Sequence, residues 1–165
     1  MRQDAQQGAA TTQHSAKIRA ANVADAVAIY QLIQPYIDDF VINAQGRDKF
    51  RPERLAQLLA QQDLNYWVYE DACVLGVIGY KHSGHLIHFF VAPSHLGHGI
   101  GRALWAVFQA WLSQQALSII TVNSSCYAKA IYEHLGFIAQ EPVTELGGIR
   151  SVFMQKNLEL RHRDE

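Results

Sequence analysis

The sequence of 165 residues predicts one domain of the α/β (α+β) class, with a mixed, mostly antiparallel central sheet of about seven strands and helices on both faces. Three runs of aromatic and β-branched residues follow one another between short turns, as consecutive antiparallel strands do. Residues 100–112 repeat apolar side chains every three or four positions, which is typical of a helix with one buried face. A short apolar run at 119–122 suits a central strand buried on both faces.

The N-terminal third predicts a short strand and two helices. Residues 1–16 are rich in Gln, Ala and Thr, so we expect a flexible leader there and the folded domain over 17–158. Asn22 is a suitable N-cap for a helix that ends near Pro35, and Pro52 opens a second helix that ends about Gln62. The strand covers Ile18–Ala20, and the expected apolar face of the first helix consists of Val23, Val27, Ile29, Tyr30 and Ile33.

The remaining elements alternate between strands and helices. Strands are expected at 66–69, 74–80 and 86–91, with turns near Asp71 and Gly84. The helix at 100–112 must pack on this sheet because its apolar face is continuous. The last elements are a short helix at 127–135 closed by Gly136, strands at 137–138 and 149–154 with Gly147 and Gly148 between them, and a charged tail at 159–165.

Composition argues against several classes of function. The formal net charge is −1, so no basic field attracts nucleic acid or an anionic membrane. Cys73 and Cys126 are too few for a disulfide framework and lack the spacing of a metal site. No apolar run approaches the length of a membrane span, and the N-terminus has no hydrophobic signal region. We therefore expect a cytoplasmic protein.

The run Val91–Gly101 points to a nucleotide-bearing cofactor. It lies between a predicted strand and a predicted helix, where free backbone amides and the positive end of the helix dipole can hold a phosphate. Gly97, Gly99 and Gly101 let the backbone approach closely, and Arg102 adds a positive charge. Alternatively, the glycines only make a tight connection between the strand and the helix.

A dinucleotide-binding Rossmann motif was weighed against this interpretation, because Gly97, Gly99 and Gly101 are similarly spaced. That motif requires an acidic residue about 20 positions further on, which binds the ribose hydroxyls. The sequence there reads Thr121-Val-Asn and contains no acid. The Rossmann interpretation is therefore disfavoured.

Four segments in the right order resemble the GNAT N-acetyltransferase superfamily. They are His85-Leu-Ile-His-Phe-Phe-Val-Ala-Pro, Gly-His-Gly-Ile-Gly at 97–101, Thr-Val-Asn-Ser-Ser at 121–125 and Ile-Tyr-Glu-His-Leu-Gly-Phe at 131–137. The resemblance covers about residues 17–157. It implies a GNAT fold with splayed fourth and fifth strands, and acetyl-CoA as the co-substrate, with the pantetheine arm in the gap between those strands.

The resemblance also implies which residues bind the cofactor. The backbone of Phe90 and Val91 is expected to pair with the pantetheine arm, and the Val91 amide to polarise the thioester carbonyl. Asn123 suits the amide-rich arm, or alternatively caps the following helix. The family usually has Arg or Gln where this chain has Leu96, which puts the cofactor affinity in doubt. The remaining cofactor-binding residues are expected to be Gly97, His98, Gly99, Ile100, Gly101, Arg102 and Tyr127.

Tyr132 is the expected general acid. It falls where the family places that residue, and a phenol with a pKa near 10 can protonate the leaving thiolate at neutral pH. Its alternative role is a core aromatic residue on the short helix. A base must take a proton from the attacking amine, and His88 is preferred to His85 and Glu70. A bulge in the strand would change which side each of these residues faces.

Two other chemistries were considered. Cys126 could carry a covalent acyl group, but no evident His partner accompanies it, and the family resemblance favours direct attack. The histidines cluster in sequence, yet a spacing of three alternates faces along a strand, so we expect ordinary surface or pocket histidines and no metal. They are His82, His85, His88, His95 and His98.

The expected function is transfer of acetyl from acetyl-CoA to a primary amine in a ternary complex. The alternative is a non-catalytic acyl-CoA-binding or sensing module of the same fold. The acceptor stays open among a small molecule, a polyamine, an amino acid and a peptide terminus. Asp38, Asp39 and Asp48 either attract a cationic amine or form a solvated loop. Because many family members are dimers, a homodimer also stays open.

Overall fold

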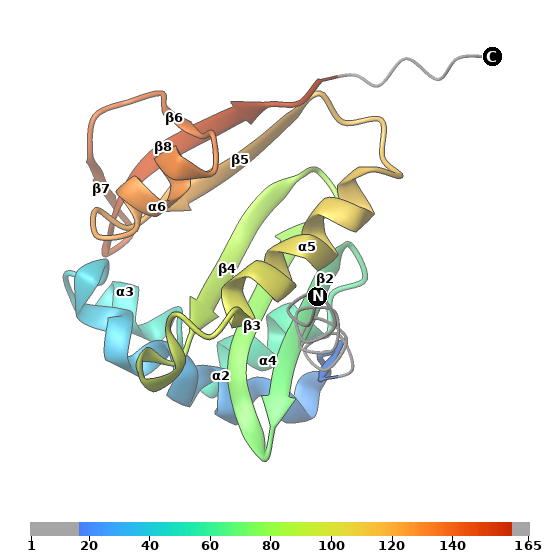
Figure 1. Cartoon of the computed structure of the whole chain (residues 1–165). Coiled ribbons are helices and arrows are strands. Elements are labelled where there is room, and N and C mark those ends of the chain that lie inside the picture. Colours follow the sequence, from blue (N-terminus) through green and yellow to red (C-terminus); the bar gives the residue numbers. More distant parts are fainter. Residues whose placement is uncertain (1–16, 160–165) are drawn as a thin grey trace, which may run out of the picture.

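The computed structural model describes residues 17–159 (Figure 1). The leader expected at 1–16 and nearly all of the tail expected at 159–165 lie outside these residues. The strands are β1 Ile18–Ala20, β2 Leu64–Asp71, β3 Cys73–Lys81, β4 His85–Val91, β5 Ile119–Ser124, β6 Ile138–Ala139, β7 Thr144–Leu146 and β8 Ile149–Asn157. The helices are α2 Ala26–Ile33, α3 Ala44–Asp48, α4 Pro52–Leu59, α5 Ile100–Leu112 and α6 Lys129–His134, with 3₁₀ helices at Val23–Asp25, Gln34–Asp39 and Pro93–His95.

The sheet confirms the predicted fold class. Seven strands follow the order β1-β2-β3-β4-β5-β8-β6, and β7 pairs with β8 off this path, which makes eight strands in all. The described strands pair antiparallel except β4 and β5, which are parallel. β7 was not predicted, because three exposed residues leave no alternating pattern to recognise.

Helices cover both faces of the sheet and bury two apolar cores (Figure 1). On one face, α5 contributes Leu104 and Phe108, which are fully buried. On the other face, α2 and α4 contribute Ile33 and Leu55. No helix within residues 17–159 is long and apolar enough to cross a membrane.

The predicted face of the first helix was partly wrong. Val23 and Val27 are about half exposed, while Ala26 and Leu32 are buried beside the predicted Ile29 and Ile33. Asn22 caps the helix as predicted, but its first turn is 3₁₀, and a turn of three residues shifts the phase of the buried face. Helix α4 ends at Leu59 rather than Gln62, and the five-residue helix α3 was not predicted.

The strands β4 and β5 diverge after two paired positions. His85 pairs with Thr121 and Leu86 with Val122, and the following residues of the two strands are not paired with each other. Figure 1 shows the strands close together at one end and separated at the other. The expected splaying of the fourth and fifth strands is therefore present.

A bulge in β4 changes which side its residues face. Leu86 lies opposite Tyr80 and His88 opposite Gly79, so Ile87 is the extra residue. Ile87 packs in the core on the α2 and α4 side, and the His88 ring contacts Phe50 on the same side. Two consecutive side chains of β4 therefore face the same helical layer.

Candidate active site

Two adjoining cavities occupy the region where β4 and β5 separate. The first, of about 150 Å³, extends from the C-terminal end of β4 to α6, and the second, of about 230 Å³, follows β4 and β5 toward α3 and α4. The residues that line both are Phe40, Phe89, Phe90, Ser125, Ala128 and Tyr132. The two cavities thus meet at residues of the predicted site.

The free backbone edge of β4 faces the gap. Ala92 N–H donates to Leu75 O at 2.8 Å, and the alternation of an antiparallel ladder then directs Val91 away from β3. Consistently, the Val91 carbonyl accepts a hydrogen bond from the Tyr36 hydroxyl at 2.7 Å. By the same alternation Phe90 directs its backbone groups toward β3, so Phe89 and Val91 present theirs to the gap. The Phe90 side chain lines both cavities.

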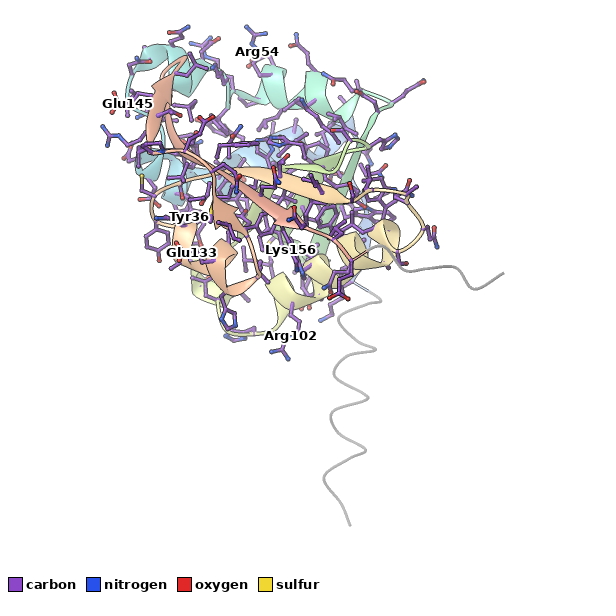
Figure 2. All side chains as sticks on the ribbon, turned by 90° about the horizontal axis from the view of Figure 1, so that it is seen from above. Tyr36, Arg54, Arg102, Glu133, Glu145 and Lys156 are labelled. Atoms are coloured by element: carbon purple, nitrogen blue, oxygen red, sulfur yellow. The ribbon has the colours of Figure 1, made fainter. Side chains whose placement is uncertain are left out.

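The glycine loop leaves amides free at the start of α5. Gly97 and Gly99 have φ values of 79° and 82°, a conformation that favours glycine. The first hydrogen bond of the helix runs from Ala103 N–H to Gly99 O at 3.0 Å. The N-cap residue Gly99 has no side chain that could accept from the first turn, so the amides before Ala103 have no partner within the helix. Arg102 projects outward from the first turn (Figure 2). This is the arrangement that holds phosphate groups.

Tyr132 stands where the two cavities meet. Its side chain is buried, its ring packs edge-on against Phe137 with a centroid distance of 5.5 Å, and burial raises the pKa of the phenol. None of the hydrogen bonds among residues 17–159 uses its hydroxyl, so the proton is available to a group in the cavity. The neighbouring Ile131 is about half exposed, so Tyr132, rather than Ile131, occupies the inner face of α6.

His88 lies in the wall of the second cavity. It is buried, and burial lowers the pKa of its imidazole to about 4. Nδ1 of His88 lies 3.1 Å from the Tyr66 hydroxyl, so Nε2 is the ring nitrogen left for a group in the cavity. The contact crosses Gly79 of β3, whose missing side chain leaves room for the Tyr66 ring.

The other candidates for the base are engaged elsewhere. His85 lines the second cavity, but its Nδ1 lies 2.8 Å from Thr121 Oγ1, and burial lowers its pKa. Glu70 forms an ion pair with Arg19 at 2.7 Å and lines neither cavity. Cys126 is exposed and likewise lines neither cavity.

The remaining cofactor-binding candidates lie around the gap. Asn123 lines the second cavity. Tyr127 and Leu96 line the first cavity, and both are more than half exposed. Asn123 does not cap the next helix, because α6 has Ala128 at its N-cap without a side-chain cap hydrogen bond, and Ser125 Oγ accepts from Ala128 N–H at 3.0 Å in the turn before it. His98 is exposed in the loop, with its ring near that of His95, and Ile100 is buried.

The structure also shows how the residues considered for a metal site are arranged, and where the acidic residues Asp38, Asp39 and Asp48 lie. No group of three or more His, Cys, Asp or Glu side chains between residues 17 and 159 is arranged to hold a metal ion. Asp38 pairs with Arg47 at 3.0 Å, and Asp48 pairs with Arg51 at 3.1 Å. Neither carboxylate lines a cavity, whereas the exposed Asp39 lines the first one.

Sequence reasoning missed four aromatic residues of the site. Tyr36 holds the Val91 carbonyl, Tyr66 holds His88, and Phe40 and Phe50 line the second cavity. All four precede the recognised motifs, in a region without a motif of its own. Gly79 within a strand was the available signal, because such a glycine often marks a close approach by another group.

Comparisons with known proteins assign the family. The model of the Acetyltransferase (GNAT) domain matches residues 38–158, so the chain belongs to the GNAT acetyltransferase family. A GCN5-related N-acetyltransferase from Rhodopseudomonas palustris is 18% identical with a TM-score of 0.69, over 86% of this chain and 94% of that one. The PaiA N-acetyltransferase from Thermoplasma acidophilum, solved with coenzyme A, is 15% identical with a TM-score of 0.66, over 86% and 98%. A ribosomal-protein-alanine N-acetyltransferase from Brucella melitensis is 22% identical with a TM-score of 0.64, over 86% and 99%.

Proposed function

We propose that this protein transfers the acetyl group of acetyl-CoA to a primary amine within a ternary complex, with Tyr132 as the general acid. The observation that carries the proposal is the position of Tyr132. This residue lines both cavities, and its hydroxyl makes no hydrogen bond among residues 17–159. Val91 at the end of β4 and Leu96 next to the glycine loop line the first cavity together with Tyr132. The family assignment supports acetyl-CoA as the acyl donor.

Each part of the site has a role in this reaction. The loop amides and the first turn of α5 bind the diphosphate, and the Val91 N–H stabilises negative charge on the thioester oxygen. The amine nitrogen forms a bond to the carbonyl carbon, and the carbon–sulfur bond breaks. The amine proton passes to His88, directly or through water, and the Tyr132 hydroxyl protonates the departing thiolate.

Burial keeps Tyr132 protonated until the thiolate departs. A raised pKa holds the phenol in its neutral form at neutral pH, and the thiolate that departs beside it is the base that takes the proton. Burial has the complementary effect on His88, which stays neutral, and when Nδ1–H donates to the Tyr66 hydroxyl oxygen the Nε2 lone pair is free to accept a proton. The acid and the base are thus in the required protonation states before the amine arrives.

Thiol release from acetyl-CoA in the presence of primary amines tests the proposal. Removing a general acid typically costs about 10²–10⁴-fold in rate, so Tyr132→Phe should lower kcat by at least ~100-fold while leaving acetyl-CoA binding intact. Tyr80→Phe is the matched control, because Tyr80 is also buried but lines neither cavity. Equal rates for the parent and Tyr132→Phe would remove the phenol from the mechanism. Acetyl-CoA binding without turnover would favour the sensing module.

A further inference from the structure

We infer that the acceptor is a small primary monoamine carried on an aryl or branched alkyl group, rather than a polycation or a polypeptide terminus. This inference rests on the proposed function and concerns the second cavity, which holds His88. Two features carry it: the chemistry of the cavity wall and the small volume of the cavity.

In the cavity wall, the rings of His88 and three phenylalanines contact one another in a closed ring of four. Ring centroids lie 5.1 Å apart between Phe40 and Phe50, 5.7 Å between Phe50 and His88, 6.0 Å between His88 and Phe90, and 6.1 Å between Phe90 and Phe40. All four side chains line the second cavity. Such a wall gains free energy by removing apolar surface of a ligand from water.

Within the described part of the chain, no Asp or Glu lines the same cavity, so residues 17–159 offer no carboxylate there to a cation. Ile87 and Ile149 extend the apolar surface. One amine next to aromatic rings is tolerated, and it reacts in its neutral form. A second ammonium group would lose its hydration without gaining an opposite charge, which is costly. Diamines and polyamines should therefore bind poorly.

Backbone pairing joins two segments that contribute residues to the cavity wall. Ile42 N–H donates to Gly148 O at 3.0 Å, Arg150 N–H donates to Phe40 O at 2.7 Å, and Val41 forms a bridge with Ile149. The segment between the 3₁₀ helix Gln34–Asp39 and α3 is thereby joined to the start of β8. Phe40 and Ile149 line the second cavity, so this pairing holds two of its wall residues in place.

The volume is consistent with a small acceptor. The second cavity measures about 230 Å³, below the roughly 300–1,000 Å³ of typical ligand pockets. Part of it must also admit the acetyl end of the cosubstrate. The space that remains suits one ring or a branched chain with its amine directed at the thioester.

Three amines distinguish the outcomes: 2-phenylethylamine, spermidine and a peptide with an N-terminal alanine. We expect kcat/KM for 2-phenylethylamine to exceed the other two by at least ~10-fold, the equivalent of about 1.4 kcal/mol. Phe50→Asp should reverse the preference between 2-phenylethylamine and spermidine, because it places a carboxylate in the aromatic wall. Phe50→Leu controls for the lost ring without adding charge.

The results separate the two proposals. A larger kcat/KM for spermidine or for the peptide would overturn the inference and leave the acetyltransferase activity standing. A failure of Phe50→Asp to shift the preference, with acetyl-CoA binding and the melting temperature retained, would also overturn it. No thiol release with any of the three amines would count against the proposed function itself.

Discussion

The Tyr66 hydroxyl lies 3.1 Å from Nδ1 of His88, although β2 and β4 are not neighbours in the sheet. The register aligns Tyr66 with Gly79 and Gly79 with His88, so the three residues form one row across three strands. A side chain at position 79 would overlap the Tyr66 ring. Gly79 thus permits a contact between side chains that β3 would otherwise separate.

Tyr66→Phe should lower kcat and leave the KM for acetyl-CoA unchanged. Without the hydroxyl, the His88 ring loses the hydrogen bond that sets its orientation, and we expect a ~10-fold loss, part of the roughly 10²–10⁴ that a positioned base contributes. Gly79→Ala should have a similar effect because it displaces the Tyr66 ring. Steady-state thiol release measures both, with Tyr80→Phe as the control. A parent-like kcat in Tyr66→Phe, alongside an inactive His88→Gln, would show that the orientation of His88 does not depend on Tyr66.

His88 should make the stability of the fold sensitive to acid. Burial lowers its pKa from 6.5 to about 4, so between these values the unfolded chain binds a proton that the folded chain does not. The free energy of unfolding therefore falls as the pH falls through this window. Between pH 7 and 4.5 the parent should lose roughly 2 kcal/mol more than His88→Gln.

Urea unfolding at a series of pH values measures this difference. His85, whose pKa is also lowered, is present in both proteins and cancels in the comparison. The side-chain hydrogen bond from Arg19 lowers the pKa of Asp25 below its ordinary value of 3.8. The stability that this contact contributes is therefore lost only as the pH falls below about 3.8, outside this window. Parallel curves for the parent and His88→Gln would mean that the buried imidazole is protonated without cost.

Gly99→Ala should weaken acetyl-CoA binding. Alanine at a φ of 82° is strained by about 1–2 kcal/mol, and relaxation of the loop would withdraw amides from the diphosphate. We expect KM for acetyl-CoA to rise about 10-fold, the equivalent of roughly 1.4 kcal/mol. Gly84→Ala is the matched control, because Gly84 has a φ of 88° in the turn before β4, at the opposite end of that strand. It should lose at least as much stability, because a Cβ there would also lie 3.2 Å from the Ile119 carbonyl oxygen, and it should keep the parent KM. An unchanged KM in Gly99→Ala would exclude the loop from diphosphate binding.

Local sequence patterns predicted most of the fold, because most helices and strands have a recognisable pattern of apolar residues within a short stretch of the chain. Runs of aromatic and β-branched residues indicated the strands β2 to β4, and a continuous apolar face indicated helix α5, and all of these elements are present. In contrast, α3 has five residues and one buried position, Gly46, which is too little for a periodic signal. The 3₁₀ turn before α2 shifted the buried face of that helix by an amount that no pattern of apolar residues reveals.

The candidate site divides in the same way. The loop, the free edge at Val91 and Tyr132 belong to continuous motifs, so the sequence could indicate them. The partners Tyr36, Tyr66 and Phe50 reach the site only through packing between segments that are distant in the chain. Which side His88 faces depended on the bulge at Ile87, and this required the register of two strands. Side-chain partners across a sheet are therefore the part that required a structure.

Gly46→Ala should separate α3 from the turn between β7 and β8. A methyl group at position 46 would overlap the backbone carbonyl of Gly148, and backbone cannot move aside as a flexible side chain can. Overpacking of this kind costs typically about 1–3 kcal/mol, so the melting temperature should fall by roughly 5 °C. Because Ile149, which follows Gly148 in the chain, lines the second cavity, displacement of the turn should raise the KM for the amine while that for acetyl-CoA stays near the parent value. Gln45→Ala, at the adjacent exposed position of the same helix, is the control and should change neither quantity. If Gly46→Ala melts with the parent and keeps its amine KM, the contact between α3 and the turn neither stabilises the fold nor shapes the acceptor site.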